Sequence, residues 1–398
     1  MDVSGHSTVA DPTLSDSGKR KVAWARSRMP ALAALRESAE RDLPLKGHRV
    51  AGCLHVTKET AVLIETISVA GAEISWSGCN PLSTQDDVAA WLASESYGVH
   101  AWHGQSTEDF YKCIDRTLDF KPTLTLDDGA DLIYRVHSTF PELAEGIIGG
   151  TEETTTGVIR LTAMAADGEL KYPVIAVNDA ETKHFFDNRY GTGQSTLDGI
   201  TRATNLLWAG KRVVVMGYGW CGRGVASRAR GLGANVIVTE IDPTKALEAL
   251  MDGFTVLHSD DAARIGEVFI TVTGGLKTIG KRTMELMQDG AIMANSGHFN
   301  VEIDIPALEQ MATNVREVRP MVKEYLIGNG KKLNLLGDGR LINLSAAEGH
   351  PSSVMDMSFA NQALASEYLT KNHSHFCLLY TSDAADDTPC VDLGGRRI

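Results

Sequence analysis

The chain has 398 residues, of which 43% are hydrophobic and 22% charged, and its formal net charge is -13 at pH 7. This size and composition are typical of a soluble globular protein with two or three domains. The negative charge argues against nucleic-acid or anionic-membrane partners, which attract basic surfaces, and no apolar run reaches the length of about 18 residues that a transmembrane helix requires.

Residues 1–20 are polar and are predicted to be disordered, without the apolar segment and cleavage site of a signal peptide. From Lys46 onward, short apolar runs alternate with helical patterns, which is typical of a parallel α/β sheet. The runs lie in "GHRVAGCLHVT", "AVLIETISVAGAEISWSGCN", "DDVAAWLASESYGVHAWHG" and "KPTLTLDDGADLIYRVH". Because ligands of open α/β sheets bind beyond the carboxyl ends of the strands, residues 21–185 are predicted to form a ligand-binding domain.

A second α/β series begins at "KRVVVMGYG", continues through "GANVIVTEID" and "EVFITVTG", and predicts another domain over residues 190–345. The pattern then becomes helical over residues 346–372, which are predicted to return to the first domain. That crossing predicts a cleft and hinges between two lobes. The predicted fold class is therefore α/β, with two lobes that are each a doubly wound, mainly parallel sheet.

A glycine fingerprint, "GYGWCG", follows the apolar run Val213–Val215 and precedes a helical stretch. Gly217, Gly219 and Gly222 suit the tight turn, the close approach of a pyrophosphate and helix–strand packing of a dinucleotide-binding (Rossmann) domain. The free N–H groups of the following helix N-terminus favour the phosphates. The context of strand and helix makes this motif much more specific than a chance glycine pattern.

Glu240 ends the predicted second strand of this domain, "NVIVTEID", about 20 residues beyond the glycines. A carboxylate there accepts hydrogen bonds from ribose hydroxyls and repels a 2′-phosphate, so NAD is predicted rather than NADP. Asp242 is the nearby competitor for this role. The fingerprint alone would suggest a dehydrogenase that consumes NAD.

The six cysteines lie at positions 53, 79, 113, 221, 377 and 390 and form no CxxC pair. Zinc sites need ligands at short, repeated spacings, so no metal is predicted. A disulfide scaffold is not expected in a chain of this length. Reduced thiols in a cytoplasmic protein are the interpretation we adopt.

Several polar blocks occur together, in one order, from about Trp24 to Leu369. They are "HVTKET", "SGCNPLSTQDD", "LDDGADL", "EETTTGV", "VNDAETKHFFDNRYGTGQS", "NSGHFNVEID" and "GRLINLSAAEGHPSSVMD". With these blocks the chain resembles the S-adenosylhomocysteine hydrolases, also called adenosylhomocysteinases, and the "FDNRYGTGQS" wording is closest to their shorter bacterial and archaeal members. No single block is strong alone, because each has an ordinary structural explanation, but their combination is highly specific.

The resemblance implies a tightly bound NAD that is regenerated in every turnover. Oxidation of the ribose 3′-hydroxyl makes the C4′ hydrogen removable as a proton, homocysteine leaves by elimination, water adds, and the ketone is reduced again. The net reaction is reversible hydrolysis of S-adenosyl-L-homocysteine to adenosine and L-homocysteine. The cofactor carries the redox step, while the protein supplies position and proton transfer.

The resemblance also implies roles for individual residues. Lys183 and Asp187 match the pair that removes the 3′-hydroxyl proton, Asp131 the C4′ carboxylate, and His55 the group at the 5′ position. Glu153 and Asn178 match ribose-side residues, Thr57, Glu59 and His350 the adenine end, and His298 the place where the lobes close. The implied catalytic set is His55, Asp131, Glu153, Lys183, Asp187 and Asn188; the substrate-binding set is Thr57, Glu59, Gln85, Asn178, His298 and His350; and the cofactor set is Thr154, Thr155, Thr156, Asn188, Gly217, Gly219, Gly222, Glu240, Asn295 and Asn343.

The chain departs from the family in residues 373–398. Family members continue with helices and a tail whose lysine and tyrosine reach the neighbouring subunit's NAD site, whereas this stretch reads "HSHFCLLYTSDAADDTPCVDLGGRRI". We interpret it as a non-native end rather than a divergent tail. Because the family's lysine and tyrosine are missing here, a weakened oligomer and an NAD content well below stoichiometric are expected. The lesser departures are Thr192, where many relatives have cysteine, Gly275 and Lys277 in a cofactor-side loop, and a missing insertion.

The resemblance implies a homotetramer or homodimer acting on a small molecule in the cytoplasm. Two alternatives stay open. Some archaeal relatives prefer an inosyl to an adenosyl substrate, and Glu59 and His350 bear on that choice. The other alternative is a non-catalytic, NAD-binding regulatory relative, although such proteins usually lose catalytic groups that this chain retains.

Overall fold

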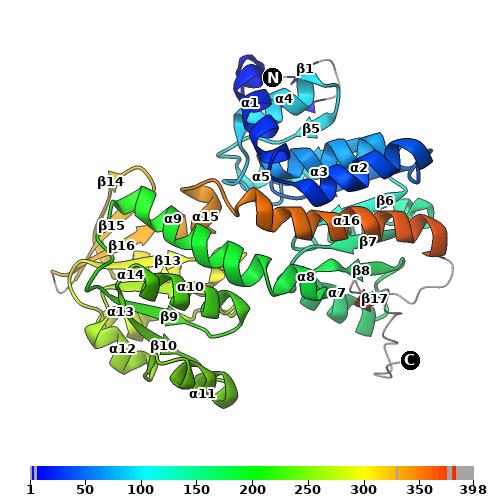
Figure 1. The fold of residues 1–398 in the computed structure, drawn as a ribbon. Coiled ribbons are helices and arrows are strands. Elements are labelled where there is room, and N and C mark those ends of the chain that lie inside the picture. The colour runs from blue at the N-terminus through cyan, green and yellow to red at the C-terminus, as the bar shows by residue number, and fades with distance from the viewer. Residues whose placement is uncertain (1, 4–6, 329, 374–378, 382–398) are drawn as a thin grey trace. The chain divides into compact units, whose positions relative to one another are not determined.

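The computed structural model describes residues 2–3, 7–328, 330–373 and 379–381. The chain divides into two compact units (Figure 1): unit 1 contains the residues up to His184 and those from Ser352 onward, and unit 2 spans Phe185–Pro351. Both units are built from parallel strands with interleaved helices, which confirms the predicted α/β class. Among the described residues, none of the helices combines the length and apolar character needed to span a bilayer.

Unit 1 contains a sheet with the strand order β1-β2-β5-β4-β3-β6-β7-β8-β17 in the described residues. The six central strands pair in parallel, and numbered along the chain they follow the order 3-2-1-4-5-6 of a doubly wound dinucleotide-type sheet. Successive strands are added toward one side of the sheet from β3 to β5 and toward the other side from β6 to β8, so the carboxyl ends of β3 and β6 are the expected ligand site. The strands are β1 (Asp2–Val3), β2 (Ser7–Thr8), β3 (Arg49–Cys53), β4 (Glu73–Ser77), β5 (Gly98–His100), β6 (Leu124–Asp127), β7 (Gly149–Glu152), β8 (Val174–Ala176) and β17 (Leu379–Thr381).

Helices cover both faces of this sheet. One apolar core packs α1–α4 and α16 on one face, and a second packs α5–α7 on the other; α2, α3 and α16 lie side by side in Figure 1. The helices are α1 (Ser15–Arg26), α2 (Pro30–Asp42), α3 (Lys58–Val69), α4 (Asp86–Ser94), α5 (Thr107–Leu118), α6 (Asp131–Ser138), α7 (Thr155–Ala166), α8 (Glu181–His184) and α16 (Ser352–Asn372).

The prediction of a disordered N-terminus is wrong for residues 12–20. A short 3₁₀ turn, Pro12–Leu14, leads directly into α1, which buries Val22 and Ala25. Lys21 forms an ion pair of 2.8 Å with Asp87 of α4. The polar sequence did not predict this helix, because most of the stability of α1 comes from the packing of a narrow apolar face rather than from the helix propensity of its residues. Of the predicted non-native tail, His373 and β17 are described, and the other residues lie outside the described part of the chain.

The N-terminus of α2 is capped by a carboxylate from α16. Asp356 is buried and accepts hydrogen bonds from the N–H groups of Ala31 (2.8 Å) and Leu32 (2.9 Å). Neither donor has a partner within the first turn of the helix. We expect Asp356→Ala to lower the free energy of unfolding by about 2 kcal/mol in urea titrations. The exposed Asp119→Ala is the control, and equal effects of the two changes would contradict the prediction.

Unit 2 contains a sheet with the order β11-β10-β9-β12-β13-β16-β15-β14. Its first six strands are parallel and again follow the order 3-2-1-4-5-6, whereas β15 and β14 add an antiparallel hairpin at one edge. The strands are β9 (Arg212–Met216), β10 (Asn235–Thr239), β11 (Thr255–Val256), β12 (Val268–Thr271), β13 (Ala291–Asn295), β14 (Ala312–Arg319), β15 (Val322–Ile327) and β16 (Lys332–Leu336).

Two apolar cores lie on opposite faces of this second sheet. One includes side chains of α9, α10 and α15, and the other includes side chains of α12–α14. The helices are α9 (Thr192–Thr204), α10 (Trp220–Gly231), α11 (Pro243–Met251), α12 (Ser259–Ile265), α13 (Lys281–Leu286), α14 (Ile305–Met311) and α15 (Ile342–Ser345).

Candidate active site

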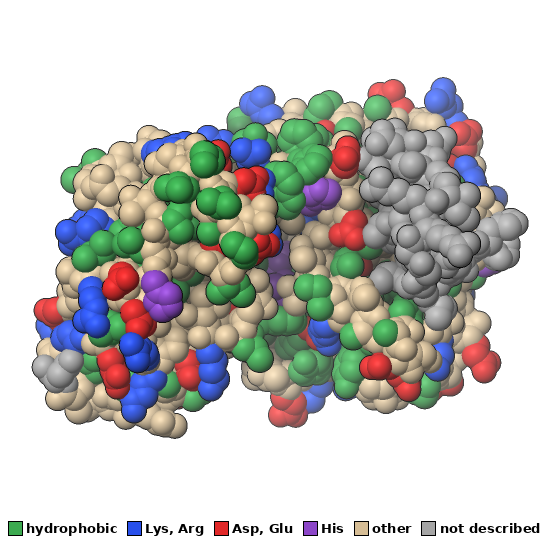
Figure 2. Space-filling view, turned by 90° about the horizontal axis from the view of Figure 1, so that it is seen from below, with side chains coloured by type: hydrophobic (Ala, Val, Ile, Leu, Met, Phe, Trp, Pro, Cys, Tyr) green, Lys and Arg blue, Asp and Glu red, His purple; other side chains and the backbone are tan. Residues whose placement is uncertain are grey.

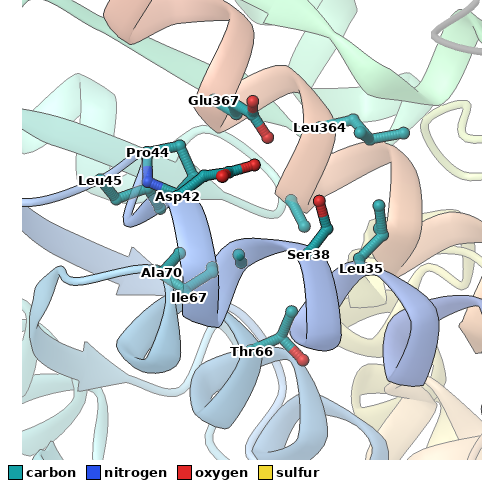
Figure 3. A pocket seen from close by; sticks show the side chains of 12 residues that line it. Leu35, Ser38, Asp42, Pro44, Leu45, Thr66, Ile67, Ala70, Leu364 and Glu367 are labelled. Atoms are coloured by element: carbon teal, nitrogen blue, oxygen red, sulfur yellow. The ribbon is translucent and has the colours of Figure 1, made fainter.

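The predicted site residues of unit 1 gather at the carboxyl ends of its central strands. His55 follows β3, Asp131 follows β6, Glu153 follows β7, and Asn178 follows β8. These are the ends at and beside β3 and β6, where a doubly wound sheet binds its ligand. The cavity of about 250 Å³ in Figure 3 is a different place: it lies between α2, α3 and α16, and none of the predicted site residues lines it.

His55 is held by two polar partners. Its Nδ1 lies 2.7 Å from Ser83 Oγ, and its Nε2 lies 3.5 Å from a carboxylate oxygen of Asp128. Cys79 Sγ donates to that same carboxylate at 3.4 Å. Burial raises the pKa of the Cys79 thiol, and the charge of Asp128 raises it further. The thiol is therefore protonated at neutral pH, and the imidazole is the group suited to move protons here.

Asp131 begins α6 and is largely buried. One of its carboxylate oxygens forms an ion pair of 2.9 Å with Nη1 of Arg160, which comes from α7. The same guanidinium nitrogen donates to the backbone carbonyl of Gly129 at 2.5 Å. Arg160 therefore fixes both the carboxylate and the turn that carries it.

Lys183 is almost completely buried, and its ammonium group faces polar atoms. Its Nζ lies 3.2 Å from Asn178 Oδ1 and 3.9 Å from a carboxylate oxygen of Glu153. Glu153 is in turn oriented by α16, because it accepts hydrogen bonds from Ser358 and, at 2.5 Å, from Gln362 Nε2. The structure thus brings three predicted residues together in one buried polar cluster.

Three of the predicted substrate-binding residues, Thr57, Glu59 and Gln85, lie around the start of α3. Thr57 caps this helix by accepting from Thr60 N–H, and Gln85 Oε1 accepts from the backbone N–H of Lys58 at 3.2 Å. Glu59 accepts from the Ser352 hydroxyl at 2.6 Å and lies 3.3 Å from the Lys58 ammonium. Glu59 is therefore fixed in place as a hydrogen-bond acceptor.

The glycine turn of unit 2 joins β9 to α10. Gly217 has φ +111°, which only glycine adopts readily. A Cβ on Gly222 would overlap the carbonyl oxygen of Gly217, whereas a Cβ on Gly219, its chain neighbours aside, would meet no atom of the described residues within 4 Å. The chain itself therefore requires glycine at 217 and 222, and the space beside Gly219 is free for a ligand.

Glu240 follows β10 and lies against this turn. Its carboxylate accepts from the N–H groups of Tyr218 at 2.6 Å, Ile241 at 2.7 Å and Asp242 at 3.0 Å. Asp242 instead caps α11 by accepting from the N–H groups of Thr244 and Lys245. The structure therefore gives Asp242 a capping role and places Glu240 beside the phosphate turn.

The side-chain amide of Asn343 is buried in unit 2. Its Nδ2 donates to Ser195 Oγ at 3.1 Å, but its Oδ1 has no hydrogen-bond partner among the described residues. Buried polar atoms are rarely left unpaired in native structures. A ligand amide is the kind of donor that would satisfy this oxygen, so the residues of unit 2 fit a nicotinamide dinucleotide.

Asn295 differs from Asn343 because both atoms of its side-chain amide are hydrogen-bonded within the protein. Its amide is buried and bonds Thr271, Gly297, Phe299 and Gly339, which ties the end of β13 to neighbouring segments. The predicted role of Asn295 as a cofactor contact therefore stays a prediction, beside this observed role as a link within the protein.

The other predicted residues of unit 2 lie in two groups. His350 Nδ1 lies 3.4 Å from a carboxylate oxygen of Asp187, and its Nε2 lies 3.3 Å from Thr192 Oγ1. Asn188 lies beside Asp187 in a π-helical turn. His298 lies in the turn after β13 and packs edge-on against Phe299.

The remaining predicted cofactor residues open α7 in unit 1. Thr154 caps this helix by accepting from Gly157 N–H, Thr155 Oγ1 accepts from Asn178 Nδ2 at 3.0 Å, and Thr156 is in the first turn.

Sequence reasoning missed the partners that orient these groups. No local spacing marks them, because Ser352, Ser358 and Gln362 are about 200 residues or more from the acids they contact. Ser83 and Arg160 are closer in sequence to their partners, and Ser83 lies inside the block "SGCNPLSTQDD", but neither residue was assigned a role. The one available signal was the polar side chains inside the helical stretch 352–366, which an ordinary core helix would not contain.

Comparisons with known proteins show the family to which the chain belongs. Residues 6–140 match the model of the S-adenosyl-L-homocysteine hydrolase family, and residues 188–349 match the model of its NAD binding domain. A solved structure of a dipicolinate synthase chain from Bacillus halodurans shares the fold with a TM-score of 0.51 at 15% identity, covering 83% of this chain and 100% of that one.

Two relatives illustrate the sequence match. An adenosylhomocysteinase from Aquifex aeolicus is 57% identical over 366 residues, which are 92% of this chain and 88% of the relative. An S-inosyl-L-homocysteine hydrolase from Methanocaldococcus jannaschii is 57% identical over 365 residues, with the same coverage. NAD is the cofactor of the matched domain. The chain belongs to the S-adenosyl-L-homocysteine hydrolase family.

Proposed function

We propose that this chain hydrolyses S-adenosyl-L-homocysteine reversibly to adenosine and L-homocysteine. The observation that carries the proposal is the buried cluster in which the Lys183 ammonium lies beside Asn178 Oδ1 and the Glu153 carboxylate. Such a lysine, held among hydrogen-bond acceptors in a buried site, is suited to proton transfer with a sugar hydroxyl. A surface lysine would not be constrained in this way.

The proposed roles are those that the family resemblance implies. Lys183, as its neutral amine and together with Asp187, takes the proton of the 3′-hydroxyl, while Glu153 and Asn178 hold the ribose. Asp131 accepts the C4′ proton, and His55 protonates the leaving thiolate and then activates water. Glu59, fixed by Ser352, accepts a hydrogen bond from the base of the nucleoside. His350, His298, Thr57 and Gln85 complete the proposed substrate contacts.

NAD would be held by the glycine turn, by Glu240 at the ribose hydroxyls and by Asn343 Oδ1 at the nicotinamide amide. Asn188, Asn295 and residues 154–156 are the further proposed contacts. When bound, NAD⁺ supplies the oxidation of the 3′-hydroxyl that makes the C4′ hydrogen acidic. The residues of the chain provide orientation and move the protons.

We also propose a homo-oligomer that works in the cytoplasm. Helix α11 turns Leu247, Leu250 and Met251 to solvent, next to the fully exposed Ile241, and Figure 2 shows hydrophobic side chains gathered on this side of unit 2. Apolar side chains gathered on a surface are typical of contacts between protomers. The four cysteines in the described residues are all free thiols, as a reducing compartment permits.

The test is release of homocysteine from S-adenosyl-L-homocysteine, trapped with a thiol reagent, with and without added NAD⁺. We expect release, without net accumulation of NADH. Accumulating NADH would instead indicate a dehydrogenase. Absence of release with added NAD⁺, while NAD still binds, would contradict the proposal and favour a regulatory, non-catalytic protein.

A second candidate substrate is S-inosyl-L-homocysteine, because a relative named for it matches as closely as the adenosylhomocysteinase does. The Glu59 carboxylate accepts a hydrogen bond equally from the adenine amino group and from N1–H of hypoxanthine. We expect the adenosyl compound to have the higher kcat/KM when both are assayed side by side. The reverse order would assign the chain to the inosyl substrate.

A further inference from the structure

Glu152 is a buried carboxylate for which the proposed mechanism has no use. It ends β7 and stands opposite Asp127, the last residue of β6, in the parallel pair of these two strands. Both side chains are completely inaccessible to solvent. Placing two carboxylates side by side in the interior is costly, so their presence needs an explanation.

Both oxygens of the Glu152 carboxylate accept hydrogen bonds, and the donors come from two segments of the chain. Oε1 accepts from Gly129 N–H (2.8 Å), Thr154 N–H (2.9 Å) and Thr154 Oγ1 (2.8 Å). Oε2 accepts from Ala130 N–H (3.0 Å). Glu152 therefore ties the turn before Asp131 to the segment that opens α7.

This turn needs such support because its backbone is unusual. Gly129 has φ +102° and Ala130 has φ +61°, a left-handed conformation that alanine adopts only at a cost. Asp127 holds the turn from its other side by accepting from the N–H groups of Asp128 and Ile133. Two buried carboxylates thus fix the loop that presents Asp131.

The Glu152 carboxyl group packs closely against Gly157, where a side chain would not fit. A Cβ on Gly157 of α7 would overlap the Glu152 carboxyl group. Burial raises the pKa of Glu152 to about 7, with the charge of Asp128 adding to the rise and the N–H donors of Gly129 and Thr154 opposing it. The chain keeps this costly acid where a neutral residue would be easier to bury.

We propose that Glu152 is a positioning residue that holds the Gly129–Ala130 turn and thereby aims the Asp131 carboxylate at the hydrogen it removes. This inference rests on the proposed function. The affected step is transfer of the C4′ proton to Asp131, while the C–H electron pair moves into the neighbouring 3′-carbonyl. In D₂O the reverse step returns deuterium to C4′.

Glu152→Gln is a selective variant. Oε1 already accepts three hydrogen bonds, so the amide keeps its oxygen there and turns its NH₂ group toward Ala130 N–H, donor against donor. Because the pKa of Glu152 in the fold is above its ordinary value, its ionisation opposes folding: its contribution to stability is present below pH 4.5 and lost as the pH rises through about 7. The neutral glutamine removes that opposition, so the variant is expected to fold.

The experiment incubates holoenzyme with adenosine in D₂O and measures two signals. NADH absorbance reports 3′-oxidation, and mass spectrometry reports deuterium at C4′. We expect Glu152→Gln to slow deuterium incorporation about 100-fold, as a misaimed catalytic group does, while the oxidation rate stays within about 3-fold of wild type. Glu145→Gln, the same change at an exposed position, should alter neither signal.

Arg160→Met is the second variant, because Arg160 holds the same turn through Gly129 O from a more exposed position. It should show the same selective loss of exchange. Unchanged exchange in Glu152→Gln, or equal loss of both signals in the two variants, would overturn the positioning role. If the wild type itself oxidises no adenosine and exchanges no C4′ hydrogen, the proposed function fails along with the inference.

Discussion

Replacing Lys183 with methionine is expected to lower kcat about 1,000-fold, the largest effect of any single substitution that the site predicts. Methionine preserves much of the buried stem but removes the amine that is proposed to take a proton from the sugar hydroxyl. KM should change much less, because Glu153 and Asn178 still hold the ribose. Homocysteine release gives kcat, and single-turnover NADH absorbance with adenosine shows whether oxidation is the step that is lost.

Lys183→Arg tests whether Lys183 acts by transferring a proton or only through its positive charge. An arginine retains the positive charge beside Glu153 but does not lose its proton in proteins. We expect this variant to be nearly as slow as Lys183→Met, because a permanent cation cannot act as a base. Recovery of more than about a tenth of wild-type activity would show that Lys183 acts by charge alone and would remove it from the catalytic set.

The fold class could be predicted because each strand and helix has a local signature. Apolar runs such as Val213–Val215 and the glycines after them are visible in the sequence, and the structure places them as a β9–α10 turn. The strand order 3-2-1-4-5-6 of unit 1 was not visible, since pairing depends on contacts between distant segments. That order explains why His55 and Asp131 lie at one edge of the sheet.

The site residues could be identified from the sequence, but their arrangement in space could not. Glu153 and Lys183 were identified by resemblance, but their shared environment depends on α16, whose Ser358 and Gln362 orient Glu153. Glu152 shows the same limit more sharply. It lies next to Glu153 in "GTEETTTG", yet neighbouring residues on an extended segment face opposite ways. Only the folded structure shows that one is part of the reactive cluster and the other lies beneath the Asp131 turn.

Gly219→Ala is expected to weaken NAD binding by about 100-fold or more while leaving the fold intact. Gly219 has φ -69°, which alanine adopts without strain, and within the described part of the chain an added Cβ would meet no atom within 4 Å beyond its chain neighbours. The methyl group would instead occupy the space where a pyrophosphate approaches the backbone. Isothermal titration with NAD⁺ should show the loss of affinity, and the thermal midpoint without NAD should stay within about 2 °C of wild type.

Gly222→Ala is the matched substitution, in which the added methyl group conflicts with the protein itself rather than with the ligand. Its Cβ would overlap the carbonyl oxygen of Gly217, so the turn must shift before any ligand arrives. We expect a lower thermal midpoint without NAD, consistent with overpacking costs of about 1–3 kcal/mol, together with weaker binding. If both alanines lowered stability equally, the space beside Gly219 would be needed by the protein itself. If neither weakened binding, the dinucleotide would not approach this turn, because a phosphate held by backbone N–H groups cannot tolerate a methyl group between them.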